Sequence, residues 1–169
     1  MAGSALIVDV VELQRRTGTR REVRAEVEME DLVVGERSVV DGRLAVDLVV
    51  EAVTEGIVAS GSLTGVSRVP CRRCLDEVDE AFRLELREVF ERSPTEGETW
   101  PIDDERIDLG PVIREAALLA LPLAPVCRED CAGPDADRFP TQLAAEGPAD
   151  SLPVRDERWA ILDSLTFDE

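Results

Sequence analysis

The stretch Val69-Pro70-Cys71-Arg72-Arg73-Cys74-Leu75 divides the chain into two parts with different patterns. Before it, apolar and polar residues alternate in several segments. After it come an acidic loop, one helical pattern and a second pair of cysteines, Cys127 and Cys131. The two pairs contain all four cysteines of the chain, and 52 residues separate Cys74 from Cys127. The fold must therefore explain why two close pairs of thiols lie so far apart in sequence.

Alternating segments on both sides of this stretch predict an antiparallel sheet. In most of them an apolar residue at every second position alternates with polar or charged residues, which is the pattern of a half-buried strand. Gly61 and Gly65 interrupt one segment and favour a bulge or a bend. Strands are expected at 5–13, 22–30, 44–53, 57–66 and 82–87. In this order they predict a meander or a partly closed barrel.

One amphipathic helix is expected after the strands. Asp108 is a candidate N-cap, and Pro111 fits the first turn, where its missing N–H needs no helical partner. Apolar residues from Leu109 to Ala120 form a broad stripe, and the helix is expected to end before Pro122. We expect this one main helix to cover the sheet, which gives an α+β fold.

Two acidic segments lack a regular pattern. The loop 93–105 combines five acidic residues with Pro and Gly and is expected to be mobile. A single domain is expected at residues 1–131, followed by a flexible acidic tail at 132–169. Within this tail, residues 156–165 are expected to form a short helix with Trp159 on its apolar stripe. Such a helix docks either on its own domain or on a partner.

The charge of the chain is strongly negative. The 37 acidic and 19 basic residues, all arginines, give a net charge of −18, of which −14 lies in residues 71–169. The absence of Lys and His excludes lysine Schiff bases and histidine-based triads, and there is no phosphate-binding Gly-rich motif, so we expect no enzyme. A chain this acidic repels a nucleic-acid backbone at long range and suits a basic protein partner, although acidity also serves solubility alone.

The sequence also bears on the cellular compartment. It has no run of about 20 apolar residues, which a membrane span requires. Its first residues lack the basic region and the length of a signal peptide. These features predict a cytoplasmic protein. Thiols stay reduced there, so paired cysteines indicate metal binding or redox chemistry before disulfides.

The four cysteines form the strongest chemical signal. Cys71-x2-Cys74 and Cys127-x3-Cys131 have the spacing of two halves of a tetrahedral zinc site. We therefore predict a structural Zn²⁺ held by all four thiols. Two alternatives stay open. The first is a redox dithiol at Cys71 and Cys74, although thioredoxin-type sites occur between a strand and a helix, not between two strands. The second is four free thiols.

One basic cluster lies near the N-terminus. Five arginines fall within residues 15–24. Among them, Arg15, Arg16, Arg20 and Arg21 are candidate contacts for phosphates or for an acidic surface. The alternative is a solvated loop that balances the acidic remainder of the chain.

Short motifs spread along the chain resemble the pattern of one protein family. They are Arg15-Arg16-Thr17-Gly18, Cys71-Arg72-Arg73-Cys74-Leu75, Glu88-Val89-Phe90, Ile107-Asp108-Leu109, Leu118-Leu119-Ala120-Leu121-Pro122, Pro125-Val126-Cys127-Arg128-Glu129-Asp130-Cys131-Ala132-Gly133 and Asp156-Glu157-Arg158-Trp159-Ala160. The family reads R-R-P-G, C-x-R-C-L, E-x-F, I-D-L, L-L-A-L-P, P-x-C-x-x-D-C-x-G and D-P-R-W-A at the corresponding places. On these motifs, the chain resembles the YceD (DUF177) family over nearly its whole length.

The chain departs from the family pattern after the second cysteine pair. Many members continue with two more cysteines, whereas Asp135 and Arg138 lie near those positions here. A self-contained zinc site in this region is therefore lost. Any metal would have to be shared with Cys71 and Cys74.

The resemblance implies a role in ribosome biogenesis, namely accumulation of 23S ribosomal RNA and assembly of the large subunit. It also implies a link to a small basic large-subunit ribosomal protein. The first hypothesis is thus a non-enzymatic assembly factor whose acidic loop 93–108 and acidic tail bind a basic ribosomal protein, a pre-ribosomal 23S rRNA particle, or both. The second hypothesis is a metal- or redox-responsive protein whose thiol pairs sense zinc or an oxidant.

Overall fold

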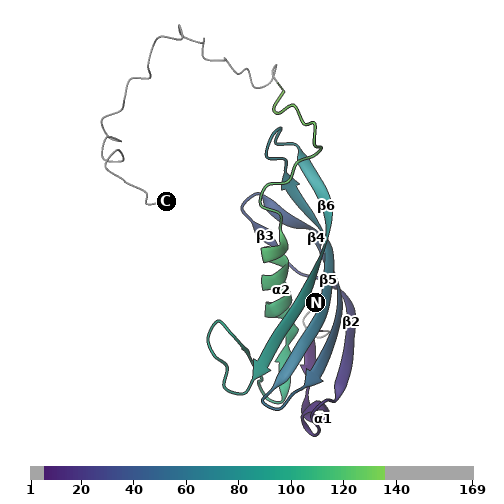
Figure 1. The fold of residues 1–169 in the computed structure, drawn as a ribbon, viewed down its shortest axis with the longest axis vertical. Coiled ribbons are helices and arrows are strands. Elements are labelled where there is room, and N and C mark those ends of the chain that lie inside the picture. Colours follow the sequence, from purple (N-terminus) through teal and green to yellow (C-terminus); the bar gives the residue numbers. More distant parts are fainter. Residues whose placement is uncertain (1–5, 136–169) are drawn as a thin grey trace, which may run out of the picture. The chain divides into compact units, whose positions relative to one another are not determined.

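The computed structural model describes residues 6–135 of the 169-residue chain (Figure 1). Within these residues, the larger of two sheets has six strands, and its four long strands, β2 (Arg20–Glu28), β4 (Arg37–Ala52), β5 (Ile57–Pro70) and β6 (Glu77–Glu91), form an antiparallel meander. Its short strands are β3 (Val33–Val34) and β7 (Trp100–Pro101). The order is β2-β4-β5-β6-β7, with β3 paired to β4, and the sheet is open.

A second, two-stranded sheet and two helices complete the described fold. β1 (Ile7–Asp9) pairs antiparallel with β8 (Arg106–Asp108). The single-turn helix α1 (Val11–Gln14) follows β1, and α2 (Leu109–Ala120) follows β8 directly. β1 and β8 lie nearly 100 residues apart in sequence, and their pairing fixes the position at which α2 begins.

Alternate residues of the long strands point to one face and form the core. Val46, Leu63 and Leu84 lie side by side across β4, β5 and β6, because the register pairs each with the next. Val112 and Ile113 of α2 are buried in the same core, and Figure 1 shows α2 lying along this sheet. The opposite face of the strands carries mostly charged and hydroxyl side chains, which is the alternation that the sequence predicts.

Gly61 allows β4 and β5 to approach closely. Its φ is +147°, and a Cβ atom there would meet the carbonyl oxygen of Asp47 and the Cα atom of Leu48. The register is regular at this point and shifts next to Gly65, opposite the extra residues 40–43 of β4. The extra residues lie in β4, while β5 pairs regularly with β6 through both glycines, so the bulge predicted in the glycine-containing strand lies in its neighbour instead.

The predicted α+β class and the antiparallel meander are confirmed, whereas the alternative of a partly closed barrel is wrong because the sheet is open. The strand predicted at 5–13 is correct only at Ile7–Asp9, since Val11–Gln14 is helical and buries Leu13. The loop predicted at 93–105 contains the short strand β7, which pairs in parallel with the end of β6. β4, β5 and β6 are longer than the segments predicted for them, whereas β2 has the predicted length and begins two residues earlier.

The helix prediction is confirmed at its first residue. Asp108 caps α2, and its carboxylate accepts a hydrogen bond from the amide of Gly110 at 2.8 Å. The helix predicted at 156–165 and most of the tail predicted from residue 132 lie outside the described residues, so the domain boundary stays a prediction. Among the described residues, no helix is long and apolar enough to cross a membrane.

Candidate metal centre

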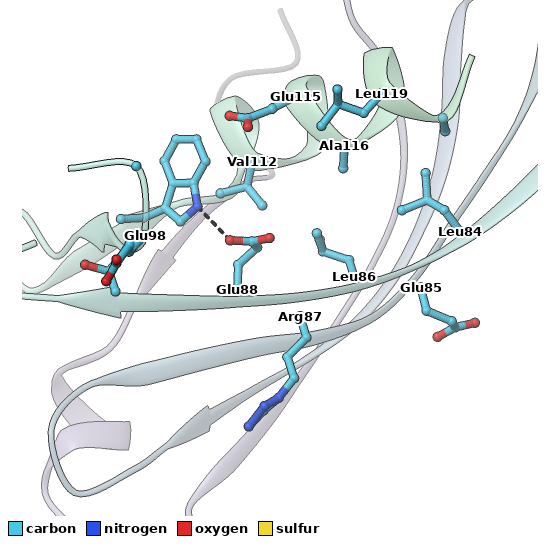
Figure 2. A pocket seen from close by; sticks show the side chains of 14 residues that line it. Leu84, Glu85, Leu86, Arg87, Glu88, Glu98, Val112, Glu115, Ala116 and Leu119 are labelled. Atoms are coloured by element: carbon cyan, nitrogen blue, oxygen red, sulfur yellow. Dashed lines mark hydrogen bonds between the residues drawn. The ribbon is translucent and has the colours of Figure 1, made fainter. Parts of the chain in front are cut away.

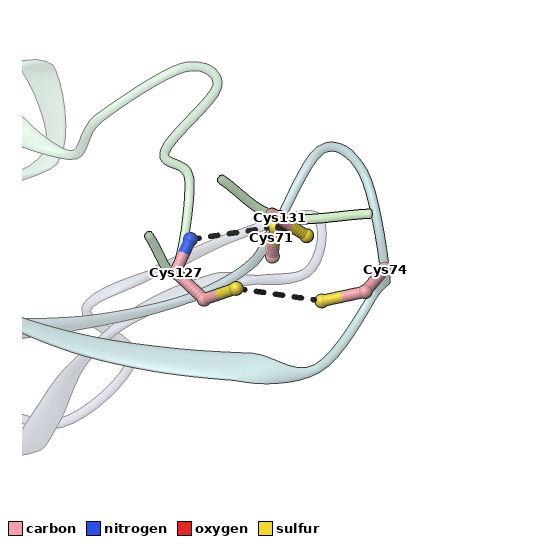
Figure 3. Close-up of side chains that lie close together, drawn as sticks. All are labelled: Cys71, Cys74, Cys127 and Cys131. Carbon is pink, nitrogen blue, oxygen red and sulfur yellow. Dashed lines mark hydrogen bonds between the residues drawn. The ribbon is translucent and has the colours of Figure 1, made fainter. Parts of the chain in front are cut away.

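The fold brings the four cysteines together at one end of the long hairpin (Figure 3). Cys71 and Cys74 lie in the turn between β5 and β6, and Cys127 and Cys131 lie in the loop after α2. The four sulfur atoms all lie within 4.8 Å of one another. The Sγ atoms of Cys71 and Cys131 are 4.0 Å apart, and those of Cys74 and Cys127 are 3.7 Å apart. The two half-sites predicted from spacing therefore converge.

These sulfur distances fit one tetrahedral cation better than disulfides. Four sulfurs bound at about 2.3 Å to a central ion stand about 3.8 Å apart, close to both measured separations. All four cysteines are free, and a disulfide would need sulfurs about 2.05 Å apart. A donor set of four thiols suits a soft or borderline cation such as Zn²⁺. The residues present thus fit a structural zinc ion.

The turn between β5 and β6 positions the first pair. The amide of Cys71 donates to the carbonyl of Asp76 at 2.8 Å, and the amide of Leu75 donates back to the carbonyl of Cys71 at 2.9 Å. Leu75 reverses the chain with a left-handed φ of +66°. As a result, Cys71 and Cys74 present their thiols to the same side of the turn (Figure 3).

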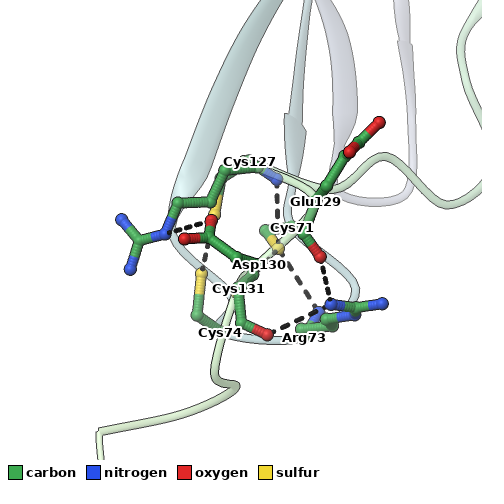
Figure 4. Close-up of polar contacts among 8 residues, drawn as sticks. Cys71, Arg73, Cys74, Cys127, Glu129, Asp130 and Cys131 are labelled. Atoms are coloured by element: carbon green, nitrogen blue, oxygen red, sulfur yellow. Dashed lines mark hydrogen bonds and ion pairs between the residues drawn. The ribbon is translucent and has the colours of Figure 1, made fainter.

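Backbone and side-chain hydrogen bonds join this turn to the loop that carries the second pair. The amide of Arg72 donates to the carbonyl of Pro125 at 2.9 Å. The guanidinium of Arg73 donates to the carbonyl oxygens of Glu129 at 2.9 Å and Cys131 at 3.2 Å (Figure 4). Hydrogen bonds from Arg72 and Arg73 therefore hold the loop after α2 in place in addition to the contacts between the thiols.

The amides around Cys71 favour its thiolate. Those of Cys74 and Cys127 donate toward its sulfur and lower the pKa of Cys71 to about 6. At Cys74, the amide of Asp76 lowers the pKa, but burial and the neighbouring thiols outweigh it and raise the pKa to about 12. Hydrogen bonding with Cys131 and then burial raise the pKa of Cys127. The Cys71 thiolate is thus stabilised, while Cys74 and Cys127 hold protons that a bound divalent cation would displace.

Comparison with known proteins places the chain in a family. The model of the family described as "Large ribosomal RNA subunit accumulation protein YceD" matches residues 59–166, a range that contains all four cysteines. The chain belongs to the YceD family.

Mycobacterial proteins are similar to this YceD chain. Uncharacterized proteins of Mycobacterium tuberculosis and Mycobacterium bovis are each 32% identical to it over 172 residues, covering 94% of this chain and 80% of theirs. An uncharacterized protein of Mycobacterium leprae is 29% identical over 139 residues, covering 77% of this chain and 64% of its own. No solved structure is significantly similar to the chain.

The predicted arginine cluster lies outside the range matched by the YceD model. Arg15 and Arg20 form ion pairs with nearby glutamates at 3.0 and 3.1 Å, and Arg21 donates to a backbone carbonyl at 3.1 Å. Arg16 is exposed beside them. None of the four lies among the residues that surround the cysteine centre in Figure 4, and Trp159 lies outside the described residues.

The sequence alone indicated no role for Arg73 at the cysteine centre. Its contacts are to carbonyl oxygens of the loop 127–131, which no side-chain pattern reveals. The only signal was its place between Cys71 and Cys74 in the C-x-R-C-L motif. The same reasoning also gave no role to Trp100, whose indole Nε1 donates to a carboxylate oxygen of Glu88 at 3.0 Å.

Proposed function

We propose that this YceD-family chain is a non-enzymatic ribosome biogenesis factor that supports accumulation of 23S rRNA and assembly of the large subunit. The observation that carries the proposal is the match of residues 59–166 to a family described by large ribosomal RNA subunit accumulation. The factor acts in the cytoplasm, where ribosomes assemble, by binding a basic large-subunit ribosomal protein or a pre-ribosomal 23S rRNA particle.

The charge of the chain supports a basic protein as the direct partner. A net charge of −18 attracts a cationic ribosomal protein and repels free RNA at long range. The acidic loop 93–108 and the acidic tail form the protein-facing surface in this proposal. Arg15, Arg16, Arg20 and Arg21 supply local phosphate contacts when the partner is a particle that contains RNA, and Trp159 supplies an apolar anchor.

A structural zinc ion belongs to the proposal because all four thiols converge. Bound by Cys71, Cys74, Cys127 and Cys131, it would supply a cross-link between the β5–β6 turn and the loop after α2. Its role is to hold the chain after α2 in one position. No chemical step is assigned to it.

The convergent thiols also favour a second candidate function, a zinc- or thiol-dependent redox or metal-responsive protein. The two functions differ in what Cys71→Ser does. In a thiol sensor this change abolishes function while the fold stays intact. In an assembly factor it lowers stability or has little effect. A thermal melt of the variant beside a functional assay separates the two.

Affinity purification of the full chain from lysate at low salt tests the proposal. Mass spectrometry and an RNA gel should find large-subunit proteins or precursor 23S rRNA, and recovery should fall steeply as salt rises. A variant with Arg15, Arg16, Arg20 and Arg21 all changed to Ala should lose RNA and keep the protein partner. If the purified chain recovers no ribosomal protein or RNA at any salt concentration, the assembly role is refuted.

A further inference from the structure

The outer edge of β6 is mostly unpaired. Along its full length β6 pairs with β5 on one side, from Pro70 opposite Glu77 to Ile57 opposite Phe90. On the other side, β7 pairs only with Phe90 and Glu91. Within residues 6–135, no strand therefore covers the edge of residues 77–89. Such an edge carries backbone N–H and C=O groups that can pair with an added strand.

A groove of about 730 Å³ lies along this edge, between β6, α2 and the loop before β7 (Figure 2). We call it the edge groove, and the side chains that matter for binding are Leu84, Glu88, Glu98, Trp100, Glu115 and Leu119. Leu84 is half-buried against the core, whereas Leu119 on α2 is 79% exposed. An exposed leucine beside a half-buried one offers an apolar contact to a ligand side chain.

The edge groove is acidic. Glu88 points into it and accepts the hydrogen bond from Trp100, while Glu98 and Glu115 lie at its rim (Figure 2). No ion pair within residues 6–135 involves Glu88, Glu98 or Glu115. β6 itself carries six acidic residues and two arginines. The carboxylates of the groove are therefore available to a cationic ligand.

The negative charge of the edge groove favours a basic ligand over the acidic segments of the chain itself. A second copy of β6 would meet an edge of the same negative sign, and like charges on an edge strand oppose self-association. Residues 136–169 of the chain contain eight acidic residues and three arginines, so they also have the sign of the groove. A segment rich in Lys or Arg has the complementary sign.

We propose that the edge groove binds an extended segment of a basic protein, which adds as a strand to the free edge of β6. Leu84 and Glu88 lie on the same face of β6, so one face of the added strand presents an apolar side chain to Leu84 and Leu119 and, further along, a Lys or Arg side chain to Glu88 (Figure 2). This inference rests on the proposed function, because it names how the basic partner is recognised. The ligand is a short sequence in which apolar and basic residues are interspersed.

An array of overlapping peptides from all large-subunit ribosomal proteins, probed with the full-length chain, tests this recognition. Basic peptides with interspersed apolar residues should bind, and the strongest is then titrated in solution. Leu119→Arg should weaken its binding at least about tenfold, since it puts a cation on the apolar wall. Leu123→Arg is the matched control, because Leu123 is 85% exposed and does not line the groove. Glu88→Gln keeps an acceptor for Trp100, and should weaken binding and reduce its salt dependence.

Hydrogen exchange gives the direct readout of strand addition. Alternate amides of β6 already pair with β5, so the readout is the amides of residues 77–89 that point away from β5, and these should gain protection when the peptide binds. Equal affinity of the Leu119→Arg and Leu123→Arg variants, or protection elsewhere, would overturn the inference but leave the proposed function standing if ribosomal material still co-purifies. Protection of these amides without peptide would mean that the chain itself or a second copy occupies the edge, and would also overturn it. Failure of both the array and the purification would refute both proposals.

Discussion

The guanidinium of Arg73 donates to the carbonyl oxygen of Cys131 at 3.2 Å, so a residue between the first two cysteines holds the backbone of the fourth. The same Nη1 atom donates to the carbonyl of Glu129 at 2.9 Å. Arg73 therefore bridges two segments that are nearly sixty residues apart in sequence, independently of any metal. The candidate centre therefore combines four potential cysteine ligands with a contact from Arg73 that supports the loop carrying two of them.

Loss of this contact should weaken metal binding. Arg73→Ala removes both hydrogen bonds and leaves all four thiols, so we expect zinc affinity to fall about 10–100-fold, as for other contacts that orient metal ligands. Competition with a chromophoric chelator measures this. Arg72→Ala is the control, because the Arg72 side chain is exposed and only its backbone amide joins the loop. Equal zinc affinity in the two variants would show that Arg73 does not support the site.

Loss of one ligand should remove the metal. Cys127 is exposed, so Cys127→Ser disturbs little packing and tests ligation itself. Metal analysis should find about one zinc per chain in the wild type and close to none in the variant. The midpoint of thermal unfolding should fall by roughly 2–4 °C for each kcal/mol lost. Wild-type protein purified without zinc, under conditions that retain zinc in other proteins, would contradict the metal centre.

The cap of α2 should contribute measurably to stability. Asp108→Ala removes the carboxylate that accepts from the amide of Gly110, at a cost of about 1 kcal/mol. Urea unfolding of the full chain measures the difference. Glu36→Ala is the control, since Glu36 is an exposed carboxylate in the turn before β4. A loss of the same size in the control would indicate an effect of charge, not of capping.

Close packing of β4 against β5 makes Gly61 intolerant of a side chain. Gly61→Ala should destabilise the protein by about 2–3 kcal/mol, because its Cβ would meet the backbone of Asp47 and Leu48. Gly97→Ala serves as the control, as its φ is +79° but its Cβ would meet nothing within 4 Å. We expect the control to cost about 1 kcal/mol from backbone strain alone. Chemical denaturation compares the two, and equal losses would argue against the clash.

The elements that the sequence predicted well are those with a local signal. Alternation revealed the long strands, Asp108 marked the first residue of the helix, and the spacing of the cysteines predicted their convergence. Each depends on neighbouring residues or on the chemistry of one residue type. The strand predicted at 5–13 was too long because Val11–Gln14 buries Leu13 by forming a helical turn, which is a tertiary effect.

The elements that the sequence did not predict depend on contacts between distant segments. The free edge of β6 exists because the sheet is open, and alternation fits an open meander and a partly closed barrel equally. The hydrogen bond between Trp100 and Glu88 joins β7 to β6 at the edge groove. The contacts of Arg73 are to backbone oxygens, so no complementary side chain marks them in the sequence.

The amount of 23S rRNA in cells tests the proposed assembly role most directly. In cells that lack this chain, the ratio of 23S to 16S rRNA should fall and large subunits should be depleted. Expression of the wild-type chain should restore both. RNA electrophoresis and sucrose-gradient profiles of the same cultures measure them. An unchanged ratio and profile in cells lacking the chain would contradict the assembly role, whatever the metal content of the cysteine centre.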